Sequence, residues 1–258
     1  MTQTSETLLP EAVPVPSIRA EVLDMARTIG AALAAALLIQ TVAFQPFTIP
    51  SASMEPGLVV GDYLVVSKFA YGWSRASVPF DPPLPSGRVF ERLPERGDVV
   101  VFRRPSDPQE TWIKRVIGLP GDRIEVVDGT VIVNGAALPQ RALGLGLDLD
   151  QPARPVERIE ERQANGRAYV TFDGGRGLGG DDRPAQVVPE GQLFVMGDNR
   201  DNSLDSRWSP DVGVGLLPVT NLVGRAEIVV ASWRPGAALW KPGTWFSLRP
   251  GRLLQTID

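Results

Sequence analysis

Apolar residues are distributed along this chain in two different ways. The stretch from Ile29 to Phe44 carries no charge, and counted from Met25 it reaches 20 residues, which is about the length that a helix needs to cross a bilayer. After it, hydrophobic positions come in short runs rich in β-branched and aromatic residues, separated by Gly and Pro, which is typical of strands. The pattern predicts a helix from about Glu21 that ends by Gln45, because Pro46 cannot continue it, and then a domain that is mainly β.

The β part divides into two blocks with a different segment between them. Strands are expected at residues 62–69, 98–105, 111–119, 168–172, 192–198 and 222–233, and a hairpin at 123–135 around Asp128-Gly129, a dipeptide typical of two-residue turns. Residues 136–188 are rich in Gly, Pro and charge with one short strand. We therefore predict a coiled antiparallel sheet or barrel-like core with an inserted β-rich subdomain. The expected organisation is a cytoplasmic tail (1–24), a transmembrane anchor (25–45), the core in two parts (46–135 and 189–258, the latter including the C-terminal tail) and the inserted subdomain (136–188).

The apolar run has three interpretations: an uncleaved membrane anchor, a cleaved secretory signal or a buried core helix. A secretory signal begins with a basic leader, but residues 1–28 carry two basic residues against four acidic ones, namely Glu6, Glu11, Glu21 and Asp24. An anchor is therefore favoured. Arg19 and Arg27 precede the run and the next basic residue is Lys68. The positive-inside tendency then places the N-terminus in the cytoplasm and the rest of the chain outside it.

Composition excludes several kinds of chemistry. The chain has no Cys and no His, so it has no Ser-His-Asp triad, no thiol nucleophile, no disulfide and no Cys/His zinc site. Oxygen-only calcium or magnesium sites remain open. The net charge of −4 argues against non-specific nucleic-acid binding, which requires a basic surface.

One short stretch, "FTIPSASMEPGL" at 47–58, holds Ser51 and Ser53 between two prolines. They are either ordinary loop serines or a nucleophile that needs a base other than histidine. A lysine can serve when it is neutral, since burial lowers its pKa from ~10.4 by up to ~3–5 units. Lys114 shares a strand face with Trp112 and Val116, which suits burial. A strand lysine is more often a solvated edge residue, and Lys68 and Lys241 are weaker alternatives.

Four sequence blocks follow the apolar run, in this order: "IPSASMEPGL", "RGDVVVFRRP", "TWIKRVIGLPGDRIEV" and "FVMGDNRDNSLDSR". They resemble the type I signal peptidases (leader peptidases) of bacteria, over roughly residues 47–134 and 189–233. The resemblance implies a membrane-bound serine endopeptidase with a Ser-Lys dyad and with no cofactor or metal. The implied roles are Ser53 as nucleophile, Lys114 as general base, Ser51 with the Ser53 N–H as oxyanion hole, Ser203 as the group that orients Lys114, and Asp205 with Arg207 as a structural ion pair. Ala52 departs from the glycine that is frequent between the two serines.

The resemblance also implies a substrate and a place. The expected substrates are exported preproteins, whose signal peptides are removed after small residues in an A-x-A pattern, at the inner (cytoplasmic) membrane with the catalytic domain on the outer, periplasmic side. An extended peptide would add to the strand edge before Ser53. The residues expected to line shallow pockets are Phe47, Ile49, Pro50, Met54, Leu58, Trp112 and Ile113, although Met54 and Leu58 also fit the pattern of core residues.

Three other functions remain as alternatives. One is a related Ser-Lys peptidase with a dedicated substrate such as a conjugative pilin. Within the same group of Ser-Lys peptidases, the self-cleaving repressors are disfavoured, because the predicted membrane anchor does not fit them. The second is a non-catalytic, membrane-anchored envelope domain. The third is a calcium loop at "GDNRDNSLDS", which lacks the ligand spacing and terminal Glu of an EF-hand.

Overall fold

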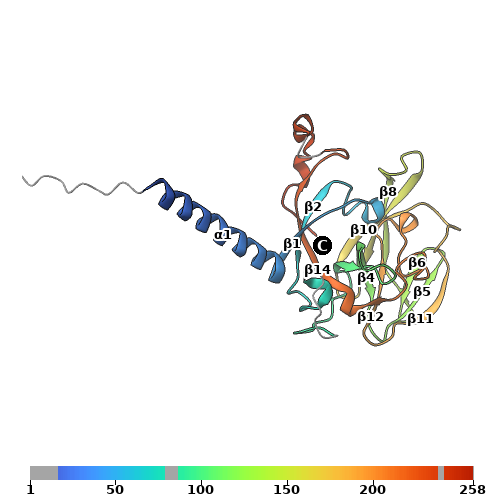
Figure 1. Cartoon of the computed structure of the whole chain (residues 1–258). Coiled ribbons are helices and arrows are strands. Elements are labelled where there is room, and N and C mark those ends of the chain that lie inside the picture. Colours follow the sequence, from blue (N-terminus) through green and yellow to red (C-terminus); the bar gives the residue numbers. More distant parts are fainter. Residues whose placement is uncertain (1–16, 79–86, 238–240, 258) are drawn as a thin grey trace, which may run out of the picture. The chain divides into compact units, whose positions relative to one another are not determined.

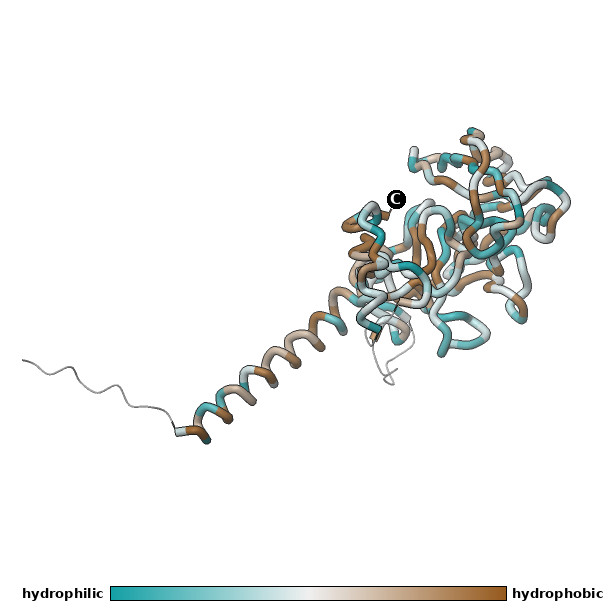
Figure 2. Tube along the Cα trace, turned by 90° about the horizontal axis from the view of Figure 1, so that it is seen from above, coloured by the Kyte–Doolittle hydropathy of each residue, from teal (hydrophilic) through white to brown (hydrophobic). Residues whose placement is uncertain are grey.

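The apolar run near the N-terminus forms one long helix. The computed structural model describes residues 17–78, 87–237 and 241–257, so residues 1–16 of the predicted tail lie outside the described part. Helix α1 (Ile18–Val42) has no buried residue, and Figure 2 shows hydrophobic positions along its length. Among the described residues it is the one helix that is long and apolar enough to cross a membrane. The chain divides into two units, Met1–Ile39 and Gln40–Asp258, and all strands belong to the second.

The helix ends ahead of Pro46, as the sequence predicts. It stops at Val42, before Gln45, and β1 (Phe44–Thr48) follows. The reason is tertiary pairing, since β1 runs antiparallel to β2 (Asp62–Ser67) with Phe44 opposite Ser67. Pro46 is compatible with β1 because β1 lies at the edge of its sheet, where a missing N–H costs no ladder bond.

The main sheet has eight strands, and all of its pairings are antiparallel (Figure 1). Its order is β1-β2-β14-β3-β4-β12-β13, with β15 paired to β14. The remaining bounds are β3 (Val99–Arg103), β4 (Thr111–Gly118), β12 (Gln192–Met196), β13 (Leu217–Pro218), β14 (Leu222–Ser232) and β15 (Gln255–Thr256). The predicted mainly antiparallel β fold behind a long apolar helix is thus confirmed.

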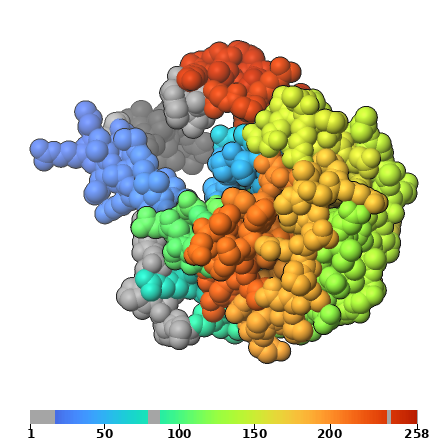
Figure 3. Space-filling view, turned by 90° about the vertical axis from the view of Figure 1, so that its right-hand side faces the viewer, coloured from blue at the N-terminus to red at the C-terminus, as the bar shows by residue number. Residues whose placement is uncertain are grey.

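Two smaller antiparallel sheets complete the fold. One has the order β11-β5-β6-β7 and the other β10-β9-β8. Their bounds are β5 (Arg123–Val127), β6 (Thr130–Val133), β7 (Ala136–Ala137), β8 (Gln140–Leu147), β9 (Pro155–Arg162), β10 (Ala168–Asp173) and β11 (Arg183–Val187). The expected hairpin turn is present, with positive φ at Asp128 and Gly129. Figure 3 shows the surface of β8 to β10, in yellow-green, directly against the orange surface of the segment near residue 200.

Short 3₁₀ turns connect the strands and carry several site residues. They are η1 (Ala52–Met54), η2 (Arg75–Ser77), η3 (Arg200–Asn202), η4 (Val219–Asn221), η5 (Pro242–Ser247) and η6 (Pro250–Arg252). The first of them is anchored in the core, because Met54 packs in one cluster with Ile49, Leu58 and Ile113. This cluster joins the turn that carries Ser53 to the strand that carries Lys114.

Candidate active site

Ser53 lies in a turn that is rigidly packed on both sides. Its neighbours Ala52 and Met54 are buried, and the Leu58 N–H donates to the Met54 carbonyl at 2.9 Å. Ser53 itself is only 8% exposed. Ala52 has no positive φ, so the departure from glycine at this position costs no backbone strain.

Lys114 is the group that faces this hydroxyl. Its Nζ lies 2.6 Å from Ser53 Oγ, and its residue is 4% exposed. Strand β4 fixes its backbone, with Lys114 opposite Val100 of β3, and the Trp112 ring lies 5.6 Å from the amine. Two residues 61 positions apart in the chain are therefore in direct contact.

The surroundings of Lys114 lower the pKa of its amine. Burial lowers the pKa of the Lys114 amine to about 8, and the nearby carboxylates of Asp205 and Asp198 only partly offset this. At pH 7 roughly a tenth of such amines are neutral, against about one in a few thousand for an exposed lysine. Lys114 can thus act as a base near neutral pH.

The other two lysines do not share this arrangement. Lys68 is fully buried and burial lowers its pKa to about 8 as well, but its Nζ makes no hydrogen bond within the described residues. Lys241 is exposed. Of the three lysines, only Lys114 contacts a serine hydroxyl in the described part of the chain.

Ser51 and Ser203 differ in their exposure and in their contacts. Ser51 is exposed and its Oγ is 3.4 Å from Ser53 Oγ. Ser203 is buried and its Oγ makes no hydrogen bond of good geometry among the described residues. A Cβ added at Gly197 would come within 2.3 Å of the Ser203 Oγ and 2.4 Å of the Ser53 carbonyl oxygen. Gly197 therefore has to be glycine, since a side chain there would collide with both.

Asp205 and Arg207 form a buried ion pair. The Arg207 guanidinium donates to both Asp205 oxygens at 2.9 Å, and the Gly197 N–H donates to Asp205 at 3.0 Å. Burial raises the pKa of Asp205, but the Arg207 charge and these donors outweigh it and leave the pKa below its usual value. The pair fixes the loop that holds Ser203.

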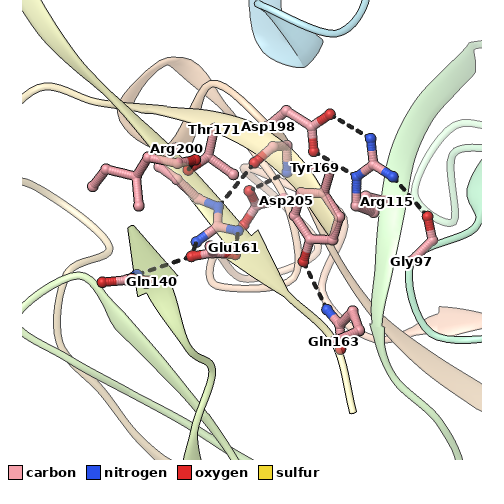
Figure 4. Close-up of polar contacts among 12 residues, drawn as sticks. Gly97, Arg115, Gln140, Glu161, Gln163, Tyr169, Thr171, Asp198, Arg200 and Asp205 are labelled. Atoms are coloured by element: carbon pink, nitrogen blue, oxygen red, sulfur yellow. Dashed lines mark hydrogen bonds and ion pairs between the residues drawn. The ribbon is translucent and has the colours of Figure 1, made fainter. Parts of the chain in front are cut away.

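Three further residues lie beside the dyad: Arg115, Asp198 and Asn199. Sequence reasoning assigned no role to Arg115 and considered Asp198 and Asn199 only as part of a calcium loop. Arg115, next to Lys114, donates two hydrogen bonds of 2.8 Å to Asp198 and one of 2.7 Å to the Gly97 carbonyl (Figure 4). The Asn199 N–H donates to the Ser53 carbonyl at 3.1 Å. All three occur in the sequence blocks quoted above, but their partners are up to 147 positions away, so no local pattern identifies their contacts.

The seven predicted pocket residues differ in how much surface they offer. Met54 and Leu58 are 0% and 2% exposed and belong to the core, as do Ile49 and Ile113. Pro50 is exposed, and Phe47 and Trp112 are half-buried.

The outer edge of β1, which leads to Ser53, is unpaired in the described sheet. This edge offers backbone groups to an extended peptide.

Comparison with known proteins gives a consistent result. The family model described as "Signal peptidase, peptidase S26" matches residues 22–233. Signal peptidase I of Rickettsia typhi is 39% identical, and that of Rickettsia canadensis 38%, over 202 residues that make up 75% of this chain and 74% of each relative. A crystal structure of a signal peptidase I from Enterococcus faecalis is 27% identical and covers 52% of this chain and 97% of that one, with a TM-score of 0.31.

Proposed function

Since the chain belongs to the peptidase S26 family and is a signal peptidase I that removes signal peptides from preproteins, we propose that it does so with Ser53 as nucleophile and Lys114 as general base. One observation carries the proposal: a buried amine lies 2.6 Å from a buried serine hydroxyl, in a chain without histidine. Lowering the pKa of the base by burial is how a lysine replaces an imidazole in this role.

The proposed reaction has two halves. Neutral Lys114 takes the Ser53 proton while Oγ attacks the scissile carbonyl, and the Ser53 N–H with the Ser51 hydroxyl stabilises the oxyanion. The Lys114 ammonium then protonates the departing amine, which leaves as the new N-terminus of the mature protein. In the second half Lys114 deprotonates a water that hydrolyses the acyl-enzyme and restores Ser53.

Ser203 is proposed to orient the base. Its buried hydroxyl lies beside the Asp205 carboxylate and interacts with it as a donor. A hydroxyl that donates keeps lone pairs free, so Ser203 is available to accept a hydrogen bond from the Lys114 ammonium when that charge forms. The Asp205–Arg207 pair holds this loop in place.

The substrate is proposed to bind as an added strand along the free edge of β1. Phe47, Pro50 and Trp112, which retain exposed surface, line the site directly, and the buried Ile49 and Ile113 limit its depth. Met54 and Leu58 support its floor from the core. Shallow pockets of this kind accept alanine and exclude larger side chains, which suits cleavage after A-x-A.

Helix α1 is proposed to hold the enzyme in the inner membrane as a single-pass anchor. Its length and composition fit a span, and Arg19 and Arg27 favour a cytoplasmic N-terminus with the catalytic unit on the periplasmic side. A preprotein is itself held in the bilayer by its apolar signal, so a shared membrane raises the effective concentration of both partners.

The dependence of kcat/KM on pH tests the role of Lys114. Burial disfavours the ammonium, so the reactive neutral amine accumulates at a lower pH than for a free lysine. We expect kcat/KM to rise about tenfold per pH unit and to level off near pH 8, where the pKa of Lys114 lies. A limb that rises through the free-lysine value of ~10.4 would contradict a desolvated base.

Covalent labelling tests the nucleophile itself. A penem is attacked at its lactam carbonyl by Ser53 Oγ, the ring C–N bond opens, and the nitrogen takes the proton from Lys114. We expect one adduct by intact mass, mapped to Ser53. An adduct on another serine, with preprotein cleavage intact, would overturn the assignment.

Assays with several unrelated signal-bearing precursors separate a general signal peptidase from one with a dedicated substrate, which would process a single precursor.

A further inference from the structure

Four consecutive residues of the 199–202 turn (Asn199 and η3) are each bonded to the inserted segment 136–188. Arg200 donates a bidentate ion-pair contact to Glu161, which also accepts from Gln140 (Figure 4). Asp201 accepts from the Gly174 N–H at 2.7 Å. The other two contacts are Asn199 Nδ2 to Asp148 Oδ2 at 3.0 Å and Asn202 Nδ2 to Asp150 Oδ2 at 3.1 Å. The insertion therefore holds this turn of the catalytic unit along its whole length.

Asn199 connects that turn to the nucleophile. Its backbone N–H donates to the Ser53 carbonyl at 3.1 Å, and its Nδ2 donates to the Ala52 carbonyl at 3.3 Å. Asn199 is 2% exposed. Since Nδ2 faces a carbonyl and a carboxylate, both acceptors, the amide has one orientation that satisfies its surroundings.

Asp148 fixes that orientation. One carboxylate oxygen accepts from the backbone N–H groups of Asp150 and Gln151 at 2.9 and 3.1 Å, and the other accepts from Asn199. The residue is 1% exposed. Both carboxylate oxygens of Asp148 therefore act as acceptors, so an asparagine at 148 would place an NH₂ group against either Asn199 Nδ2 or the two backbone donors.

We propose that Asp148 is a positioning residue of the active site: acting through Asn199, it holds the backbone of Ala52 and Ser53 so that the Ser53 hydroxyl meets the Lys114 amine. The inserted subdomain is then a working part of the active site. This inference rests on the proposed roles of Ser53 and Lys114. We expect loss of Asp148 to slow the chemical step, because a misplacement of the reacting groups by about 1 Å can lower the rate about 100-fold.

The test compares Asp148→Ala, Asp148→Asn, Asn199→Ala and the Asp148→Ala/Asn199→Ala double variant in the full-length protein. Asp181→Ala is the matched control. Asp181 is a buried aspartate of the same insertion whose carboxylate accepts from the Leu178 N–H at 2.7 Å. The readouts are kcat and KM on a preprotein, the rate of Ser53 acylation by a penem, and the midpoint of thermal unfolding.

We expect each single variant at 148 or 199 to lower kcat and the acylation rate about 10- to 100-fold, with KM changed by less than about twofold. The double variant should be no slower than Asn199→Ala, because Asp148 acts through Asn199. The Asp181→Ala control should lower the unfolding midpoint while it keeps the wild-type kcat. If Asp148→Ala does not fold, the near-isosteric Asp148→Asn decides by the same criteria.

Three outcomes overturn the inference: a wild-type kcat in a folded Asp148 variant, rate losses that multiply in the double variant, or a loss confined to KM. Failure of the underlying proposal is recognised separately, since the penem adduct on the wild-type protein would then map to a residue other than Ser53. If the adduct maps to Ser53 and the Asp148→Asn enzyme is fully active, the positioning role of Asp148 is refuted and the assignment of Ser53 as nucleophile stands.

Discussion

Replacing Ser53 by alanine is expected to abolish cleavage of a signal-bearing precursor. The Ser53→Ala protein lacks the oxygen that forms the acyl-enzyme, and no other hydroxyl of the described residues is hydrogen-bonded to Lys114. Loss of a serine nucleophile costs on the order of 10⁶-fold in kcat where it has been measured in another protease. The assay is incubation of the purified enzyme with one precursor, followed by N-terminal sequencing of the product. The fold should persist, because the lost hydroxyl makes no bond that supports the core, and the thermal unfolding midpoint checks this.

Ser51→Ala is the matched control, two positions earlier in the same segment. It removes a proposed oxyanion donor but leaves Ser53 and Lys114 in contact, so we expect a loss of about 10²–10³ in kcat and a normal acyl-enzyme adduct. Cleavage by Ser53→Ala at a rate equal to or above that of Ser51→Ala would refute the assignment of the nucleophile.

The strands of the main sheet were largely readable from the sequence, whereas part of the insertion was not. β4 and β14 follow β-branched runs that mark a strand by composition alone. β8 and β9 do not: β8 contains Gly144 and Gly146, and β9 begins at Pro155. They form because they pair with one another at six positions on either side of a register shift, and such pairing overrides the weak local preference of each strand.

The site illustrates a similar limit. Alternation along β4 correctly suggested a sheltered Lys114, yet Lys68 is equally buried with the same lowered pKa. Burial alone therefore does not distinguish a base from a structural lysine. The contact with Ser53 does, and it depends on how η1 packs against β4. Met54 illustrates the reverse case, because an apolar residue beside the nucleophile turned out to be 0% exposed.

The contacts that complete the site were beyond sequence reasoning for a physical reason. Asp148 lies in a Gly- and charge-rich stretch with no motif, and its partner Asn199 is 51 positions away. A hydrogen bond between two polar residues leaves no periodic trace in either segment. Its importance appears only when both are found buried, at 1% and 2% exposure, since a buried carboxylate and a buried amide must satisfy each other.

Replacing Lys114 by arginine is expected to inactivate the enzyme as completely as the loss of Ser53. The guanidinium keeps the positive charge and the hydrogen-bond donors, but its pKa lies above ~12, so no useful fraction is neutral at any working pH. Raising the pH to 10 should not restore cleavage. Lys114→Met removes the amine and keeps a similar apolar stem, so it should be equally inactive. Its unfolding temperature should be no lower than that of the wild type, because burying an amine costs desolvation free energy that methionine avoids. Preprotein cleavage from pH 6 to 10 and thermal unfolding of both variants are the measurements.

Lys68→Met gives this prediction its sharpest control, because it removes the other buried lysine with a lowered pKa. Lys68 contacts no serine hydroxyl in the described residues, so the variant should keep kcat and the pH limb near 8, and its unfolding midpoint should not fall. If Lys114→Arg still cleaves the precursor, or if Lys68→Met moves the limb while Lys114→Met leaves it in place, then the proton on Ser53 goes to a base other than Lys114.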